Sequence, residues 1–183
     1  IKKFVDLKSV TPTIRNKRII LEGGSIDVNG KGILLTTREC LLSNIQVRNP
    51  GLNKQEYEFI FKKYLGIKEV VWLNKGIAGD DTHGHIDDLA RFVSEKKIFV
   101  AYEKNKKDKN YKILKKNFEI LKQSKYLKKA RIIKIPMPKP KYIQGTRVPA
   151  TYLNFYIANK KVLVPTYNDK NDKYILLLRT RSC

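Results

Sequence analysis

The sequence predicts a mixed α/β fold in a single domain, and three observations support this. Short runs of β-branched and aliphatic residues alternate with two longer segments whose apolar residues recur at helical spacing. No stretch rich in glycine, proline or serine divides the 183 residues into two parts. Hydrophobic residues make up 42% of the chain, a proportion that supports a buried core. We therefore expect residues 1–183 to form one domain.

The first half of the chain contains a hairpin and a helix. The Asn29–Gly30 pair is a turn signal, and we expect it to join two strands. A helix over residues 53–65, ended by Gly66, is predicted by apolar residues at helical spacing: Tyr57, Ile60, Phe61, Tyr64 and Leu65. The strands expected in this half cover residues 18–21, 25–28, 32–36 and 69–73.

The second half predicts one more helix between strands. Residues 111–127 form an amphipathic pattern whose inward positions are Ile113, Leu114, Phe118 and Leu121. Lysines occupy most of the remaining face of this helix, and we expect that face to be exposed to solvent. The strands expected in this half cover residues 84–92, 98–102, 132–135, 152–157 and 162–164.

The net charge of +22 is typical of proteins that bind nucleic acid or another polyanion. Residues 101–141 carry fourteen Lys and one Arg against three acids, so +12 of the charge is local. The chain has 30 Lys and only 9 Arg, whereas recognition of phosphates and bases favours Arg. We therefore interpret the charge as a solvated helix face and do not expect nucleic acid. A noncatalytic polyanion-binding protein stays as the alternative.

Other features bear on the compartment. The longest purely aliphatic run, residues 175–178, is far shorter than the ~20 residues of a membrane helix, so we expect no membrane span. No signal region is visible, and two Cys do not make a disulfide framework. We expect a reduced, cytoplasmic setting.

Residues 80–88 hold both histidines of the chain and four carboxylates. On an extended strand, His85 and Asp87 project from the same face because side chains repeat every two residues. His83 by itself is better interpreted as an exposed loop residue. The His85 and Asp87 pair therefore predicts a functional site.

Two chemistries fit this cluster, and local pattern leaves both open. Asp80, His83, His85 and Asp87 are candidate ligands of a divalent metal. Alternatively, fixed carboxylates hold a cationic guanidinium while an imidazole moves protons. Glu22, which precedes two glycines, is then suited to orient His85.

A family resemblance favours the second chemistry. Residues 21–25, 35–42, 48–50 and 72–92, followed by 149–155 and 162–167, resemble the agmatine deiminase branch of the guanidine-modifying superfamily. Its most specific part combines Gly79, Asp80, Asp81 and Thr82 with His85, Ile86 and Asp87. The resemblance covers residues 18–173 in order, and the tail 173–183 diverges from it.

The resemblance implies a five-bladed α/β propeller of ββαβ modules, of which this chain supplies some blades. It implies hydrolysis of agmatine to N-carbamoylputrescine and ammonia, a step toward putrescine, without a cofactor or metal. By position, His85 becomes the general acid/base, Glu22 its partner, Asp87 a guanidinium anchor and Asp80 a further residue lining the site. Peptidyl-arginine or arginine are the alternative substrates. Exposed propeller edges favour association between copies.

Two parts of the family pattern have no counterpart. The family nucleophile is a Cys in a glycine-rich motif near the end of the chain, and no such motif occurs in this sequence. Cys40 matches a structural position, and Cys183 lacks the neighbouring glycines and His. A second guanidinium anchor belongs upstream of Glu22, but Asp6 lacks the expected surroundings. We therefore expect an incomplete catalytic domain that is inactive by itself, with its nucleophile unknown.

Overall fold

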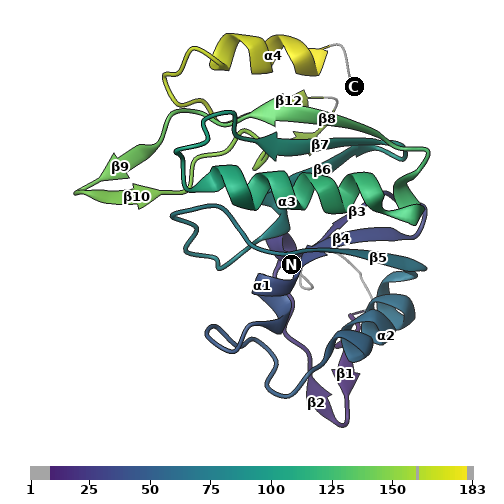
Figure 1. Ribbon diagram of the computed structural model, residues 1–183. Helices are drawn as coiled ribbons and strands as arrows, with labels where there is room; N and C mark the ends of the chain where they lie inside the picture. The colour runs from purple at the N-terminus through teal and green to yellow at the C-terminus, as the bar shows by residue number, and fades with distance from the viewer. Residues whose placement is uncertain (1–8, 160, 181–183) are drawn as a thin grey trace.

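The computed structural model describes residues 9–159 and 161–180 of the chain. Within these residues the predicted mixed α/β fold is confirmed: two three-stranded sheets are accompanied by helices, and three two-stranded hairpins surround them (Figure 1). No helix in this part of the chain has the length and apolar character needed to cross a membrane.

The first sheet belongs to a ββαβ unit. Strands β3 (Asp27–Val28) and β4 (Ile33–Thr37) pair antiparallel, which confirms the hairpin predicted from the Asn29–Gly30 turn. The chain then forms α1 (Arg38–Leu42) and α2 (Lys54–Leu65). It returns as β5 (Glu69–Leu73), which pairs parallel to β4.

The second sheet repeats this order. Strands β6 (Ala90–Ser94) and β7 (Lys97–Tyr102) pair antiparallel. Helix α3 (Asn110–Gln123) and the short turn η3 (Lys125–Leu127) follow. Strand β8 (Arg131–Pro136) then pairs parallel to β7. The described part of the chain thus contains two consecutive ββαβ units.

Smaller elements flank the two units. In Figure 1 the hairpin β9–β10 projects to one side of the second sheet, and α4 runs along the end that carries β8 and β12. These elements are β1 (Thr13–Ile14), β2 (Lys17–Arg18), β9 (Lys141–Ile143), β10 (Thr146–Val148), β11 (Tyr156–Ala158), β12 (Lys161–Leu163) and α4 (Asp172–Thr180).

Helix α2 has strong signals at both ends. The side chain of Asn53 accepts from the backbone N–H of Glu56, and Glu56 reciprocates to the backbone of Asn53, which forms a capping box. Gly66 ends the helix at φ 66°, a left-handed conformation that glycine adopts without strain. The helix predicted over residues 53–65 is therefore confirmed, with Gly66 as its stop.

Strand β4 separates two hydrophobic clusters, because neighbouring strand residues face opposite ways. Leu34 packs with Tyr57 and Phe61 of α2. Leu35 belongs to the larger cluster, which extends to Leu114 on α3. Helix α3 packs against both β5 and β7, so it joins the two sheets (Figure 1).

The strand predicted over residues 18–21 is wrong beyond Arg18. The backbone N–H of Ile20 donates to Asn49 Oδ1 at 2.8 Å, and the Asn49 amide donates back to the Ile20 carbonyl at 2.7 Å. A side chain thus replaces the neighbouring strand as hydrogen-bond partner, and the segment that leads to Glu22 is anchored without a sheet.

Two other predicted strands begin later than expected. The segment 84–92 contains the 3-10 turn η2 (Ile86–Asp88), and β6 begins only at Ala90. Strand β11 begins at Tyr156 instead of residue 152, because the Leu153 N–H bonds the Thr151 hydroxyl at 3.2 Å and bends the chain.

Candidate functional site

Glu22 and His85 meet where two short turns lie against each other. Glu22 caps the turn η1 (Gly23–Ser25), and His85 caps η2. His85 Nε2 lies 2.8 Å from Glu22 Oε2, within hydrogen-bond distance. The fold therefore brings together two of the residues predicted to form the site, although 63 positions separate them in the chain.

Gly24 permits this approach because it has no side chain. A Cβ at Gly24 would lie 2.4 Å from His85 Nδ1 and 2.8 Å from Asp87 Oδ2. Both distances are shorter than any normal contact, so both side chains border the same face of Gly24. His85 and Asp87 thus converge as predicted, but the 3-10 turn η2 and not strand alternation brings them together.

Asp87 carries the most unusual polar atom of the site. Its Oδ1 is buried and has no hydrogen-bond partner in the described part of the chain. Burial raises the pKa of the Asp87 carboxyl, while the nearby His85 and Arg91 oppose this. A buried, unpaired carboxylate oxygen is costly, and a cationic N–H donor would offset that cost.

Both carboxylate oxygens of Asp80, unlike Oδ1 of Asp87, accept hydrogen bonds. Its Oδ1 accepts from the N–H of Thr82 at 2.8 Å and from the Thr82 hydroxyl, and its Oδ2 accepts from the N–H of Gly84 at 2.7 Å. Asp80 therefore shapes the loop that leads into His85. The structure gives it a different surrounding from Asp87.

Arg48 is a site residue that no local pattern singled out. Its Nε donates to Glu22 Oε2 at 2.8 Å, the same oxygen that faces His85. Burial pushes the pKa of the Glu22 carboxyl up, but the hydrogen bonds from His85 and Arg48 outweigh this and hold that pKa below its ordinary value. The only sequence signal for Arg48 was its place in the family-like segment 48–50.

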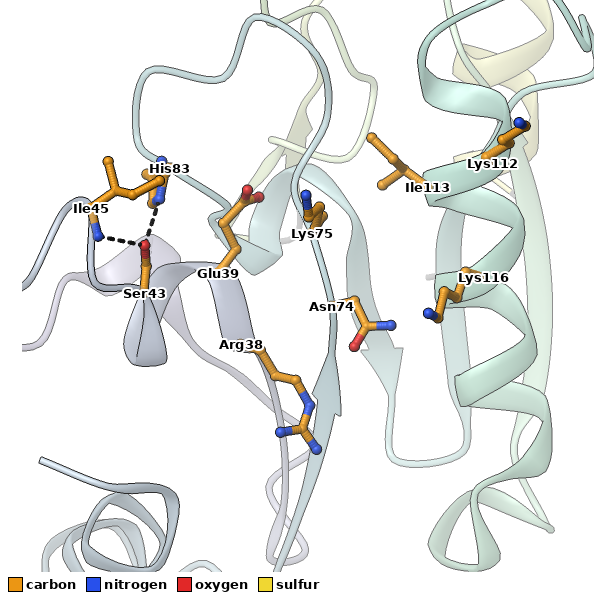
Figure 2. Close-up of a pocket in the computed structure, with 10 residues that line it drawn as sticks. All are labelled: Arg38, Glu39, Ser43, Ile45, Asn74, Lys75, His83, Lys112, Ile113 and Lys116. Atoms are coloured by element: carbon orange, nitrogen blue, oxygen red, sulfur yellow. Dashed lines mark hydrogen bonds between the residues drawn. The ribbon is translucent and has the colours of Figure 1, made fainter.

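His83 does not join His85. It has φ 59°, is half-buried, and its Nε2 lies 3.0 Å from Ser43 Oγ. His83 lines a separate cavity of about 560 Å³, whose lining includes neither Glu22, His85 nor Asp87. Figure 2 shows His83 beside Ser43 and Ile45. The cavity is lined by Arg38, Glu39, Ser43, Ile45, Asn74, Lys75, His83, Lys112, Ile113 and Lys116.

The metal site hypothesised on Asp80, His83, His85 and Asp87 is not assembled. Among the residues that the structure describes, one group of three ligand-type side chains is close enough to share an ion: Glu22, Cys40 and His85. That group does not suit a cation, because the Arg48 guanidinium already occupies Glu22 Oε2.

Cys40 has the properties of a structural residue. Its side chain is 1% exposed, and burial raises the pKa of its thiol to about 12. Since the thiolate is the nucleophilic form, such a thiol does not attack a substrate. Cys183 and Asp6, the other residues considered for missing roles, lie outside the described residues.

Comparison with known proteins shows the family of the chain. The family model for the Porphyromonas-type peptidyl-arginine deiminase matches residues 2–180, a longer stretch than the residues 18–173 that carry the sequence resemblance. The chain belongs to the Porphyromonas-type peptidyl-arginine deiminase family. The family match includes most of the tail, where α4 begins at Asp172.

The curated relatives match most of the chain but are longer. A Legionella pneumophila (strain Paris) protein is 41% identical over 151 residues, which are 81% of this chain and 43% of the relative. The agmatine deiminase of Medicago truncatula is 34% identical over 190 residues, covering 92% of this chain and 50% of its own length. The chain thus spans about half the length of these relatives.

A solved structure shows the same fold. The C. jejuni agmatine deiminase with substrate bound superposes with a TM-score of 0.82 at 40% identity, over 89% of this chain and 47% of that one.

Proposed function

We propose that these residues form the acid/base part of a guanidine-hydrolysing site, in an enzyme that converts agmatine and water to N-carbamoylputrescine and ammonia. The observation that carries the proposal is the unpaired, buried Oδ1 of Asp87 beside the Glu22–His85 pair. Relatives named agmatine deiminase support the choice of substrate. The reaction would serve putrescine biosynthesis in the cytoplasm.

Asp87 would hold the substrate. A guanidinium presents planar N–H donors, and a carboxylate accepts them through short, charge-assisted hydrogen bonds. Because burial raises the pKa of Asp87, its charge is costly without a partner, and a cationic substrate would relieve that cost. Holding the guanidinium also presents its carbon to the nucleophile in a fixed orientation.

His85 would move the protons. The ionised carboxylate of Glu22 only accepts hydrogen bonds, so the ring nitrogen Nε2 that faces it carries a proton. Nδ1, on the side of Gly24 and Asp87, is then the nitrogen that exchanges protons with the reacting groups. Glu22 fixes the tautomer of the imidazole and stabilises its charged form.

The family reaction uses a Cys thiolate, which bonds to the guanidinium carbon. His85 then donates a proton to the nitrogen that leaves as ammonia when its bond to carbon breaks. In the second half, His85 takes one proton from water and the water oxygen bonds to the carbon. The carbon–sulfur bond then breaks to restore the thiolate, and the second proton of the water passes to solvent as the carbonyl forms. Neither Cys40 nor any other thiol in the described residues is suited to the first step.

The two ββαβ units would be two blades of a five-bladed propeller. Each unit has the antiparallel pair, helix and parallel strand that such a blade requires. A crystal structure of the natural protein in which these 183 residues occur tests this. A fivefold ring with both units as neighbouring blades is expected, and an open arrangement of the two units would contradict it.

The substrate is tested by measuring ammonia release from agmatine, arginine and a peptidyl-arginine by that natural protein. We expect agmatine to be preferred, with N-carbamoylputrescine as the second product. His85→Ala should lose at least about 100-fold in rate, because general acid/base groups contribute that much. A His83→Ala control should keep its rate, since His83 lies in the separate cavity. Full activity in His85→Ala would exclude the role of His85.

We expect the purified 183-residue chain to release no ammonia from agmatine. Removing a covalent nucleophile removes the reaction path itself, so no residual pathway of similar rate remains. Hydrolysis by this chain, with turnover abolished in Cys40→Ser, would show instead that Cys40 is the nucleophile.

A further inference from the structure

The guanidinium of Arg48 is tied to three segments of the chain at once. Beside its bond to Glu22, one terminal nitrogen donates to the carbonyls of Cys40 at 3.2 Å and Gln46 at 3.3 Å, and the other donates to the carbonyl of Thr82. The Arg48 side chain is only 7% exposed. Its plane is therefore fixed by neutral backbone groups, independently of Glu22.

Glu22 by itself is much less constrained. Its side chain is 39% exposed and accepts no hydrogen bond from the turn that Glu22 caps. A partly exposed glutamate loses rotamer freedom when it is held on one partner, which costs free energy. A single bond to His85 has to offset that cost unless a second group shares it.

Arg48 and His85 meet the same oxygen, Glu22 Oε2, each at 2.8 Å. The carboxylate is thus held between a fixed cation and the imidazole. An Arg suits this place because its five N–H donors lie in one rigid plane, whereas a Lys is a single flexible point charge.

We propose that Arg48 is the positioning residue of the site: it holds the Glu22 carboxylate against His85, and so fixes the ring nitrogen that exchanges protons. The inference rests on the proposed function for its catalytic consequence, but the pairing of Glu22 with His85 can be measured without turnover. The hydrogen bonds of Arg48 within the described residues go to Glu22, Cys40, Gln46 and Thr82, and none goes to Asp87.

The test compares Arg48→Lys and Arg48→Met with the parent chain by NMR, using labelled His and Glu side chains. The 15N signal of His85 Nε2 reports its bond to Glu22. We expect both variants to move this signal toward that of a free imidazole, because neither replacement can bridge Glu22 and the backbone carbonyls. The pKa of Glu22 should rise in Arg48→Met and stay low in Arg48→Lys, which keeps the charge.

Arg91→Lys is the matched control. Arg91 is also a poorly exposed arginine in an ion pair, with its Nε 2.7 Å from Asp27 Oδ1, but it does not touch Glu22. Its substitution should leave the Glu22 and His85 signals unchanged. A His85 Nε2 signal that stays at the parent position in Arg48→Lys, or that moves equally in Arg91→Lys, overturns the proposal. Unfolding of both Arg48 variants also overturns it, because Arg48 would then support the fold as a whole.

In the natural protein, kcat for guanidine hydrolysis should fall about tenfold or more in Arg48→Lys with little change in KM, as expected when an orienting group is lost. A change in KM alone would contradict this, since it would mean that Arg48 binds substrate. If no guanidine is hydrolysed at all, the proposed function fails while the NMR result still decides the role of Arg48.

Discussion

Gly24 controls how closely the two turns of the site approach each other. A methyl group there would overlap His85 Nδ1 and Asp87 Oδ2, so both side chains would be displaced. The neighbouring Gly23 has no heavy atom within 4 Å of the same position. A side chain would therefore collide with the site at Gly24 but would find open space at Gly23.

Gly24→Ala should therefore reduce guanidine hydrolysis by about 100-fold, the scale of loss expected when a reacting group shifts by about 1 Å. Overpacking should also lower stability by about 1–3 kcal/mol. Gly23→Ala serves as the control and should change neither quantity appreciably. Steady-state kinetics and thermal unfolding of the two variants check this, and equal behaviour of the two would contradict the geometry.

The turn η2 contains a second acidic group with a different role. Asp88 is 5% exposed and accepts a hydrogen bond from the Asn154 amide at 3.1 Å. Burial raises the pKa of its carboxyl to about 6, with Asp87 and Asp80 adding to the rise, while Asn154 and His85 oppose it. Asp88 links η2 to the segment before β11, because it accepts hydrogen bonds from Thr151 and Asn154.

This pKa makes the stability of the fold depend on pH. A folded pKa above the unfolded value means that the protonated form is favoured in the folded chain, so the stabilisation is complete below about pH 4 and is lost as pH rises to about 6. At neutral pH, a pKa raised from 3.8 to about 6 means that the ionised Asp88 lowers the free energy of unfolding by about 3 kcal/mol relative to acid pH.

Asp88→Asn keeps an oxygen for the Asn154 amide but cannot ionise. Its free energy of unfolding should exceed that of the parent at pH 7, and the gap should shrink toward pH 4. Denaturant unfolding at several pH values measures this difference, in which the titration of Asp27 and Glu22 largely cancels. A gap that does not change between pH 4 and pH 7 would contradict the assignment.

Elements with local signals were predictable from the sequence, and those fixed by distant partners were not. Helix α2 carries its own capping box and glycine stop, so its bounds follow from neighbouring residues. The segment 18–21 looks like a strand, but its partner is the Asn49 side chain, 29 positions away. The bend at Thr151 likewise depends on its bond to the carbonyl of Asp88, 63 positions away.

The candidate site shows the same division. Motif and residue type predict Glu22, His85 and Asp87 as site residues, and the structure places their side chains together. Their catalytic and binding roles stay predictions. The predicted geometry, in which His85 and Asp87 share one face of a strand, is wrong, because the two residues are joined by a 3-10 turn that strand alternation does not predict. Arg48 could not be assigned a role, because its importance arises from contacts with Glu22 and Thr82 that only the fold creates.

On the scale of the whole molecule, the lysine-rich face and the candidate site are formed by different elements: the lysines by α3, the site by the turns η1 and η2. Helix α3 buries Leu114 and Leu121, whereas Lys112, Lys115 and Lys116 are exposed. The predicted solvent-exposed lysine face is therefore confirmed. The site instead depends on a few acids held by the two turns between and before the sheets. The proposed cationic substrate would therefore meet a local negative group on a positively charged protein.

The most direct test of the central claim is an NMR titration of the 183-residue chain with agmatine, following the Asp87 carboxyl and the His85 ring. Putrescine, which has an amine in place of the guanidine, is the matched control ligand. We predict that millimolar agmatine shifts both signals, that putrescine at the same concentration does not, and that Asp87→Asn abolishes the shift of His85. Equal shifts with both ligands, or none with agmatine, would contradict the assignment of Asp87 as the guanidinium anchor.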